Sequence, residues 1–313
     1  MNEIKPSDPV SLFRALSEEA RLRLLGMLSA GEFSVQELTE ALKMPQSTIS
    51  RHLGRLREAG LVETRRDGTL IFYSKGSGVT AEVWEFIEPR LSNLPAHAED
   101  RKAAQRLLDR RRQASQAYFD RMARRYSEVT EPGGSWEALA GALAMGYDGK
   151  DVADAGAGEG ELTLRLAASA RMVYAIDHSR EMVKLLREKT RRLKNVVVSE
   201  GDLEDLPLDD ASCDVVFLSQ VLHHCAQPKK ALKEAHRILR RNGRLIVIDL
   251  DEHQHEWTRK QLGDQWLGFD PEEVRAWTQD AGFAALQVHD EPTAHEALDA
   301  FVLTGIKADA RVT

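Results

Sequence analysis

Hydrophobic positions at helical spacing predict several short helices at the start of the chain. Leucines recur over residues 12–28 in two groups, and Ser17 stands between them as the expected cap of the second helix. Ser34 and Glu37 form a capping-box pattern, which predicts a third helix over residues 34–42. The chain therefore begins as a compact set of helices.

The next helix, predicted over residues 46–59, has one apolar and one polar face. Ile49, Leu53 and Leu56 share the side that we expect to be buried. The other side carries short hydrogen-bond donors and arginines, which can reach base edges and neutralise phosphates in a DNA groove. The candidate DNA-binding residues are Gln46, Ser47, Thr48, Ser50, Arg51, His52 and Arg55.

Alternating residues after this helix predict a β-hairpin. The segment LVETRRDGTLIFYSK places Asp67-Gly68 between two strand-like runs, which is a strong hairpin signal. Arg65 and Arg66 lie near the expected tip and are further candidates for phosphate contacts. Helices followed by a basic hairpin predict a winged helix-turn-helix, an α+β fold that reads DNA.

Residues 80–130 change to a strongly helical and basic pattern. Two helices are expected, separated by Pro95, and the second extends from Ala98 to Val129. One stripe of that helix carries Tyr118, Phe119, Met122 and Tyr126. Such a stripe most simply packs against a neighbouring domain, and the alternative makes Tyr118 and Tyr126 part of a lid over a ligand pocket.

Strands and helices alternate beyond residue 134. Strands are predicted at Asp151–Ala155, Met172–Ile176, Val196–Ser199, Cys213–Leu218, Arg244–Leu250, Ala284–His289 and Leu298–Ile306. Helices are predicted at Glu161–Ala168, Arg180–Leu193, Pro228–Leu239 and Pro271–Ala281. This alternation predicts a mostly parallel, doubly wound α/β sheet that binds a ligand beyond the carboxyl ends of its strands, with the last two strands as an antiparallel edge pair.

A glycine-rich turn follows the first of these strands. The segment DVADAGAGEGELTLR reads as a strand end, a turn and a helix start, and Asp177 closes the next strand about 20 residues later. Gly156, Gly158 and Gly160 let the backbone approach a ligand closely. A dinucleotide-binding loop would need glycine at the position of Glu161, so the spacing excludes that type of site.

Composition limits the classes of function. The 313 residues are enough for about two domains. A formal net charge of −7 argues against DNA binding by bulk charge, so any DNA contact must come from a local basic surface. Cys213 and Cys225 are too few for a disulfide framework or a thiolate metal cluster. Without a signal-peptide pattern or a long apolar run, we expect a soluble cytoplasmic protein.

The amino-terminal motifs carry a family resemblance. FRALSEEARLRLL, SVQELTEALKMPQSTISRHLGRLREAGLV and the basic hairpin resemble the ArsR-type bacterial repressors over residues 13–75. The resemblance implies a homodimer that reads a palindromic operator in double-stranded DNA. It does not imply metal sensing, because metal-responsive members carry a cysteine pair in the helix that corresponds to residues 34–42, where this chain has no cysteine.

The carboxy-terminal pattern resembles class I S-adenosylmethionine-dependent methyltransferases, which have a seven-strand Rossmann-like fold. The resemblance implies that Asp177 accepts the ribose hydroxyls, that Asp202 and Leu203 border adenine, and that Ser219 and Gln220 line the methionine end. The residues it assigns to S-adenosylmethionine or S-adenosylhomocysteine are Asp154, Gly156, Ala157, Gly158, Gly160, Asp177, His178, Met182, Asp202, Leu203, Ser219, Gln220, His223 and Tyr126.

Catalytic and metal-binding residues are less evident. LSQVLHH resembles a segment of ubiquinone and menaquinone biosynthesis methyltransferases, which makes His223 and His224 candidates for a general base, with a structural role as the simpler interpretation. A second group has metal-ligand residue types, but alternate residues at a strand end need not converge, and we expect no metal there. That group is Asp249, Asp251, Glu252, His253 and His255.

These patterns predict a DNA-binding domain over residues 1–79, a helical connector for dimerisation over 80–131, and a methyltransferase domain over 132–313. The arrangement resembles ArsR-type regulators of the methionine cycle, which implies a transcriptional regulator that binds S-adenosylhomocysteine or S-adenosylmethionine as its effector. The alternative is an active methyltransferase of a small molecule with an appended DNA-binding domain. The chain lacks the cysteines of arsenite methyltransferases and the Asn-Pro-Pro-Tyr type motif of base methylation.

Overall fold

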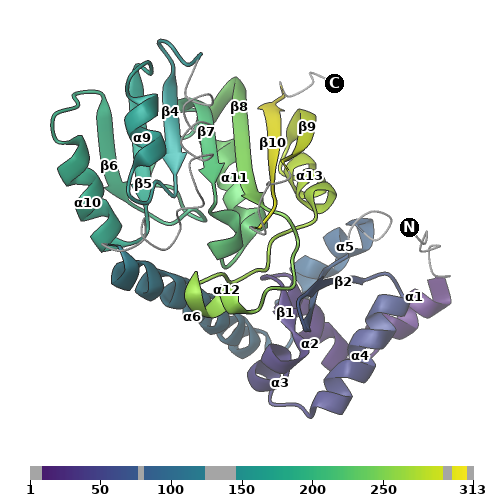
Figure 1. The fold of residues 1–313 in the computed structure, drawn as a ribbon. Coiled ribbons are helices and arrows are strands. Elements are labelled where there is room, and N and C mark those ends of the chain that lie inside the picture. Colours follow the sequence, from purple (N-terminus) through teal and green to yellow (C-terminus); the bar gives the residue numbers. More distant parts are fainter. Residues whose placement is uncertain (1–8, 77–80, 124–145, 292–297, 309–313) are drawn as a thin grey trace. The chain divides into compact units, whose positions relative to one another are not determined.

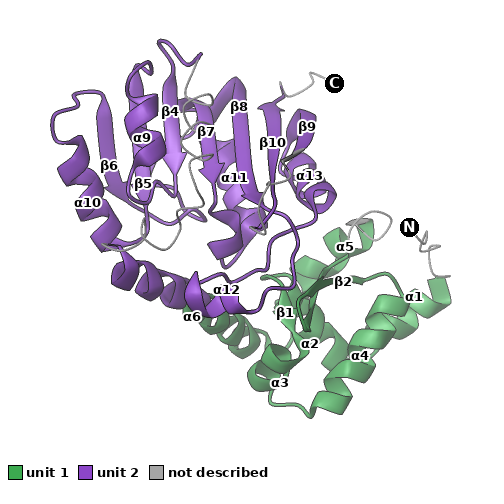
Figure 2. Cartoon of the chain, in the orientation of Figure 1, with its two compact units in different colours: residues 1–110 green, residues 111–313 purple. Residues whose placement is uncertain are grey.

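The computed structural model describes residues 9–76, 81–123, 146–291 and 298–308. The chain divides into two compact units, residues 1–110 and 111–313 (Figure 2). The boundary between the units falls within the connector predicted over residues 80–131. The division of the chain by role at residues 79 and 131 stays a prediction.

The first unit contains the helices that the hydrophobic pattern predicts. They are α1 (Pro9–Leu16), α2 (Glu19–Leu28), α3 (Val35–Leu42), α4 (Gln46–Glu58) and α5 (Ala81–Leu91). The capping box is present, since the Ser34 hydroxyl accepts from the Glu37 backbone N–H and Glu37 accepts from the Ser34 N–H. The predicted Ser17 cap is wrong: Glu18 is the N-cap residue of α2, and the Ser17 hydroxyl donates back to the Arg14 carbonyl.

A small antiparallel sheet completes this unit. Strands β1 (Phe33–Ser34), β2 (Val62–Asp67) and β3 (Leu70–Lys75) lie in the order β1-β3-β2. Asp67 pairs with Leu70, so the predicted hairpin turns through Gly68 and Thr69. Gly68 has φ of 59°, a conformation that glycine adopts without steric cost and that tight hairpins require.

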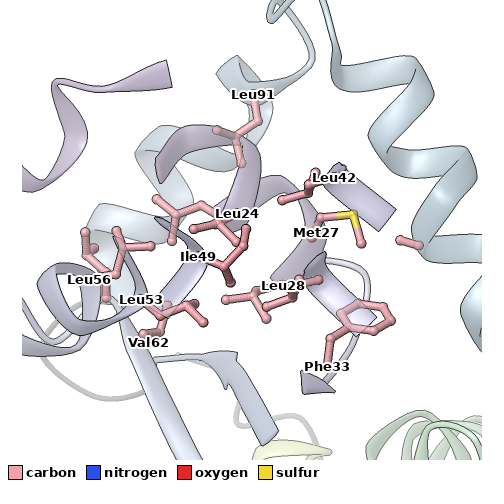
Figure 3. Packing of buried hydrophobic residues seen from close by; sticks show 14 of the residues in the cluster. Leu24, Met27, Leu28, Phe33, Leu42, Ile49, Leu53, Leu56, Val62 and Leu91 are labelled. Carbon is pink, nitrogen blue, oxygen red and sulfur yellow. The ribbon is translucent and has the colours of Figure 1, made fainter. Parts of the chain in front are cut away.

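The core of the first unit lies between its helices and the hairpin (Figure 3). Leu24 of α2 and Ile49 and Leu53 of α4 are fully buried, as the apolar spacing of both helices predicts. Trp84 of α5 is also fully buried, and its indole N–H donates to the Leu61 carbonyl. These contacts fix α4 by its apolar face.

Helix α6 (His97–Met122) crosses the boundary between the two units along the chain. Its first half belongs to the first unit, where Ala104, Leu107 and Leu108 join the core. There Asp100 accepts two hydrogen bonds from the Arg23 guanidinium, at 2.7 and 2.8 Å. The helix is described as far as Met122, and its predicted end at Val129 lies outside the described residues.

The second unit is built on a seven-stranded sheet. The strands are β4 (Asp151–Ala155), β5 (Met172–Asp177), β6 (Val196–Glu200), β7 (Cys213–Ser219), β8 (Leu239–Leu250), β9 (Phe283–Glu291) and β10 (Ala300–Lys307). Their order is β6-β5-β4-β7-β8-β10-β9, and β10 alone runs in the direction opposite to the other strands. The predicted antiparallel pair of the last two strands is confirmed at one edge of the sheet, with β9 outermost and β10 between β9 and β8.

Helices cover this sheet as the alternating pattern predicts (Figure 1). Helices α9 (Glu161–Leu166) and α10 (Arg180–Thr190) pack near β4, β5 and β6, whereas α11 (Pro228–Ile238) and α13 (Pro271–Asp280) pack near β8, β9 and β10. Two short elements, η2 (Leu222–His224) and α12 (Trp257–Gln261), follow the carboxyl ends of β7 and β8. Parallel pairing of β4, β5 and β7 brings their carboxyl ends to one edge of the sheet.

Candidate functional site

The glycine loop between β4 and α9 makes a tight turn at this edge. Gly156 has φ of 85°, and a Cβ there would lie 2.3 Å from Val221 Cγ1, so a side chain would clash. Gly158 has φ of 52°, but a Cβ there would meet open space. Gly156 therefore serves close packing of the loop, while Gly158 leaves its backbone accessible to a ligand. Ala157 lies between them, and Gly160 is the N-cap residue of α9.

Asp154 is buried beneath this loop. Its carboxylate accepts a 2.5 Å hydrogen bond from the Thr163 hydroxyl of α9. Burial, together with the nearby Asp177 carboxylate, raises the pKa of Asp154 to about 6, although the Thr163 hydrogen bond opposes the shift. The contact ties the end of β4 to the first turn of the following helix.

Asp177 lies at the carboxyl end of β5, as the motif requires. One carboxylate oxygen accepts from the Gly158 N–H at 2.9 Å, and the other accepts from the Ser179 N–H at 2.8 Å. Burial raises the pKa of Asp177, although His178 and these two N–H donors oppose the effect. Each carboxylate oxygen has more than one lone pair, so the group can also accept a ligand hydroxyl.

The second half of α6 contacts the residues around Asp177. The Gln116 side chain donates to the His178 carbonyl at 2.9 Å, and the Ser115 hydroxyl lies 3.2 Å from His178 Nε2. Asp120 accepts from the hydroxyl of Ser179, which caps α10. All of these residues belong to the second unit, so they form one local cluster.

Arg112 extends this cluster to the residue expected to border adenine. Its Nε lies 3.3 Å from Asp202 Oδ2, and its terminal nitrogen pairs with Glu204 at 2.5 Å. Glu204 is buried and also accepts from the backbone and the side chain of Gln227. Asp202 and Leu203 are both partly exposed. The pair connects α6 with the loop after β6.

The remaining predicted cofactor residues occupy different environments. Ser219 ends β7, and its hydroxyl is buried without a hydrogen bond in the described part of the chain, which leaves it available to a polar ligand atom. Gln220 has φ of 56°, an uncommon conformation for a residue other than glycine. Met182 is 1% exposed among Tyr118, Phe119 and Ala123, so in this structure it belongs to the core. Tyr126 lies outside the described residues.

The aromatic stripe of α6 is buried where it is described. Tyr118 and Phe119 are each 8% exposed and meet edge to face at 5.2 Å. The Tyr118 hydroxyl donates to the Gln261 carbonyl, and the Phe119 ring meets the His224 ring edge to face at 4.7 Å. Over its described residues, the stripe packs within the second unit, whereas a lid that includes Tyr126 stays a prediction.

His223 and His224 are buried in η2, next to the end of β7. His223 Nδ1 lies 2.6 Å from the fully buried Asp249 carboxylate. Burial disfavours the charged ring, but Asp249 outweighs this effect and raises the pKa of His223. Burial and the neighbouring His223 lower the pKa of His224 well below its usual value.

Asp264 faces the same two imidazole rings. It lies 3.8 Å from His223 Nε2 and 3.9 Å from His224 Nδ1, and it is 5% exposed. Burial raises the pKa of Asp264, while His223 and the nearby Thr258 hydroxyl oppose it. Neither Asp264 oxygen has a hydrogen bond of acceptable geometry among the residues that the structure describes.

The sequence analysis did not predict several residues of this site. Four polar residues lie at helical spacing on one face of α6: Arg112, Ser115, Gln116 and Asp120. This spacing was the sequence pattern that could have predicted them. The sequence around Asp264 contains no pattern that predicts its role, because Asp264 lies next to His223 only in the folded protein.

The predicted DNA-binding face of α4 is largely exposed. Gln46, Ser47, Ser50, Arg51 and Arg55 are exposed, and Thr48 is partly exposed. His52 is a correction: it is 6% exposed, and its Nδ1 lies 3.6 Å from a Glu18 carboxylate oxygen. Burial lowers the pKa of His52.

The hairpin arginines differ from each other. The Arg65 side chain is only 11% exposed and lies 3.4 Å from Glu32, so in this structure it is held against the unit. The Arg66 side chain is exposed at the tip and donates to the Gly68 carbonyl. Arg66 is therefore the hairpin arginine that the structure presents to solvent.

Comparison with known proteins agrees with both halves of this description. Residues 18–64 match the family model described as bacterial regulatory protein, arsR family, and residues 153–247 match a methyltransferase domain. The biofilm growth-associated repressor of Agrobacterium fabrum is 42% identical over 83 residues, which are 26% of this chain and 71% of the repressor. An uncharacterized methyltransferase of Mycobacterium tuberculosis is 38% identical over 125 residues, which are 40% of this chain and 49% of that protein.

Solved structures of methyltransferases have a fold similar to that of the second unit. Magnesium protoporphyrin IX methyltransferase from Synechocystis, with bound S-adenosylhomocysteine, has a TM-score of 0.52 and 19% identity, covering 63% of this chain and all of that one. The chain spans between 38% and 49% of the length of the methyltransferases it matches first in sequence.

The chain therefore belongs to the bacterial regulatory proteins of the arsR family and carries a class I methyltransferase domain. The helix-turn-helix segment implies DNA binding. The second unit has the fold of S-adenosylmethionine-dependent methyltransferases. In the described part of the chain, no helix is long and apolar enough to cross a membrane.

Proposed function

We propose that the protein is a dimeric transcriptional regulator whose methyltransferase domain binds S-adenosylhomocysteine or S-adenosylmethionine as an effector. The observation that carries this proposal is the position of α6. Its first half packs into the core of the DNA-binding unit, and its second half contacts the residues flanking the predicted adenosyl site. The two halves of α6 thus contact the DNA-binding unit and the predicted adenosyl site, respectively.

The proposed ligand contacts follow from the local geometry. Gly158 offers an accessible backbone, Asp177 has lone pairs left for ribose hydroxyls, and Ser219 has an unused hydroxyl for the methionine end. Asp202 would accept the exocyclic amine of adenine, and in this structure it lies beside Arg112 instead. Adenine binding would therefore compete with the Arg112 contact and weaken the docking of α6.

On the DNA side, we assign the major-groove contacts to the exposed face of α4. Gln46, Ser47 and Ser50 would reach base edges or phosphates, and Arg51 and Arg55 would neutralise phosphates. The hairpin would act as a wing through Arg66. A homodimer would place two α4 helices in successive major grooves of a palindromic operator.

The coupling can be measured with the full chain. A binding fragment is first selected from random duplex DNA, and its Kd is measured at fixed salt with and without each adenosyl ligand. We expect a saturating ligand to change the Kd for DNA by about 5- to 150-fold, and DNA to change the ligand Kd by the same factor. Arg112→Ala should keep DNA binding and reduce this coupling, because it removes the contact with which adenine competes.

Arg275→Ala is the matched control, since it removes a partly exposed arginine of α13 that pairs only locally with Glu272 in the described contacts. The control should retain the wild-type coupling. Calorimetry establishes that each ligand is bound under the conditions of the DNA measurement. An unchanged Kd for DNA with ligand bound would overturn the effector hypothesis.

A second candidate function is methyl transfer to a small molecule, favoured by the buried His223–Asp249 pair beside the predicted methionine end. A carboxylate on Nδ1 leaves Nε2 as the basic nitrogen, which suits a general base. Methyl transfer itself needs mainly alignment of the acceptor with the sulfonium. Transfer of labelled methyl groups from S-adenosylmethionine to cell-extract fractions, lost in His223→Gln, would support this activity.

A further inference from the structure

Three buried side chains from two separate segments converge next to η2. His223 and His224 come from η2, and Asp264 comes from the loop after α12. Each offers one ligand atom, and these atoms lie within 4.8 Å of one another. Among the described residues, these three side chains form the cluster of histidine, cysteine or carboxylate groups that is close enough to hold a metal ion. The residues from Asp249 to His255 do not form such a cluster there.

Backbone hydrogen bonds hold the two segments together. The N–H groups of Gln265 and Trp266 both donate to the His223 carbonyl, at 3.0 and 3.1 Å. The Gln265 side chain donates to the His224 carbonyl at 2.7 Å, and the Trp266 indole donates to the Cys225 carbonyl. Asp264 is therefore fixed opposite the imidazoles by its neighbours in the chain.

The Asp264 carboxylate itself remains unsatisfied. It is more than nine-tenths buried, and both of its oxygens lack a hydrogen bond within the described residues. Burial raises the pKa of this carboxylate more than the His223 ring and the nearby Thr258 hydroxyl lower it, and buried carboxylates are normally fully paired or bound to a metal. Asp249 is a second buried carboxylate on the other side of His223, so the pocket carries two negative groups. A divalent cation would neutralise both.

Asp249 also prepares His223 as a ligand. Its contact with Nδ1 favours the tautomer in which Nδ1 carries the proton, and that tautomer leaves the lone pair on Nε2, the nitrogen facing Asp264. A carboxylate behind a histidine is the usual support of a metal-bound imidazole. Asp249 is itself fixed by the backbone N–H groups of Leu222 and Leu250.

We propose that His223, His224 and Asp264 form a binding site for a divalent first-row transition metal ion. Two ligand atoms on one zinc ion can be at most about 4.2 Å apart, since each bond is roughly 2.1 Å. Asp264 Oδ1 lies 3.8 Å from His223 Nε2 and 3.9 Å from His224 Nδ1, within that limit. The three ligand atoms lie within 4.8 Å of one another, so the two imidazoles would move closer together on binding. Binding through His224 Nδ1 would replace its 3.2 Å contact with the Gly263 carbonyl.

The donor set defines the class of ion. Two imidazole nitrogens and one carboxylate suit Zn²⁺, Fe²⁺ or Co²⁺ and leave positions for water or another ligand, whereas Mg²⁺ and Ca²⁺ prefer oxygen donors. The inference does not rest on the proposed regulatory function, because metal binding is measured without an adenosyl ligand. It is an alternative to the general-base role of His223, since a metal-bound Nε2 has no free lone pair. It can therefore be tested on metal content alone.

The test uses the untagged full chain, because an affinity tag of histidines would bind metal itself. After treatment with EDTA, the protein is dialysed against Zn²⁺ and its metal content is measured by mass spectrometry, and Co²⁺ is titrated while its visible absorption is followed. We expect about one ion per chain and absorption bands of a low-symmetry Co²⁺ site. Asp249→Asn should weaken metal affinity by about 10- to 100-fold.

Asp264→Asn removes a ligand while conserving side-chain shape and should abolish the Co²⁺ bands. His255→Gln is the matched control, because it removes an exposed histidine outside the grouping and should leave the bands unchanged. Circular dichroism establishes that each variant is folded, and a rise in wild-type Tm on adding Zn²⁺ provides a readout independent of the variants. Wild-type protein that binds no ion, or equal binding by Asp264→Asn, would overturn the proposal.

Discussion

At the scale of single residues, the site depends on carboxylates held away from water. Asp154, Asp177, Asp249 and Asp264 are all buried at one edge of the sheet. Their partners differ: a hydroxyl for Asp154, backbone N–H groups for Asp177, an imidazole together with backbone N–H groups for Asp249, and two nearby imidazoles for Asp264. Their partners, more than their burial, distinguish their roles.

Asp154 gives a pH-dependent prediction at this scale. Its pKa is about 6 in the folded protein against 3.8 as the ordinary value, so the folded state holds the proton more tightly. Its contribution to stability is fully present below pH 3.8 and is lost as the pH rises to about 6. The asparagine in Asp154→Asn cannot ionise, so the free energy of unfolding of this variant relative to wild type should rise by about 2–3 kcal/mol as the pH increases from 4 to 7.

Urea unfolding across that pH range measures the difference. Asparagine keeps an oxygen that can accept from Thr163, so the comparison isolates the charge. Asp209→Asn, at an exposed carboxylate of the same unit, serves as the control. A difference between Asp154→Asn and wild type that does not change with pH would contradict the prediction.

At the scale of elements, local signals predict helices better than they predict helix caps. Ser34 caps α3 as expected, because Glu37 completes the capping box three residues later. Ser17 has the right residue type, but the chain turns one residue later and its hydroxyl bonds to α1 instead. Residue type alone does not decide which serine caps a helix.

The two serines make a paired prediction. Ser34→Ala should lower the free energy of unfolding by about 1 kcal/mol, since the Glu37 backbone N–H loses its acceptor and the Glu37 carboxylate loses the serine hydroxyl. Ser17→Ala should cost less than about 0.5 kcal/mol, because its hydroxyl is exposed and caps no helix. Chemical denaturation of the two variants measures both values, and equal losses would show that Ser17 caps α2 in solution.

At the scale of the whole molecule, an acidic protein carries a local basic surface. The net charge is −7, yet α4 presents Arg51 and Arg55 on one exposed face. DNA binding must therefore depend on these few charges, and its strength should fall steeply with salt because each neutralised phosphate releases counterions. The same acidity should oppose binding to DNA in other orientations.

Arg51→Ala should reduce the slope of log Kd against log salt concentration by about one for each protomer bound. The measurement is DNA binding at several salt concentrations with the selected duplex. Arg275→Ala again provides the control, since a partly exposed arginine on α13 should not alter the slope. An unchanged slope in Arg51→Ala would remove this residue from the proposed phosphate contacts.

The sequence by itself determined the two kinds of fold and most of their elements. Helix and strand positions in both units follow from hydrophobic periodicity, which records the buried face of each element. The glycine loop and Asp177 could also be located, because a strand, a turn and a helix in succession fix their relative positions. These signals are local, so a linear pattern contains them.

Only the tertiary structure decided which distant side chains meet. His52 is buried although its position on α4 is polar, because α2 and its cap residue Glu18 cover it. Strand β10 enters the sheet between β8 and β9, which no local pattern specifies. Asp264 reaches His223 across 41 residues, and Arg112 reaches Asp202 across 90, through packing that depends on the whole domain. Contacts of this kind arise from the fold of the chain, because they join segments that share no local pattern.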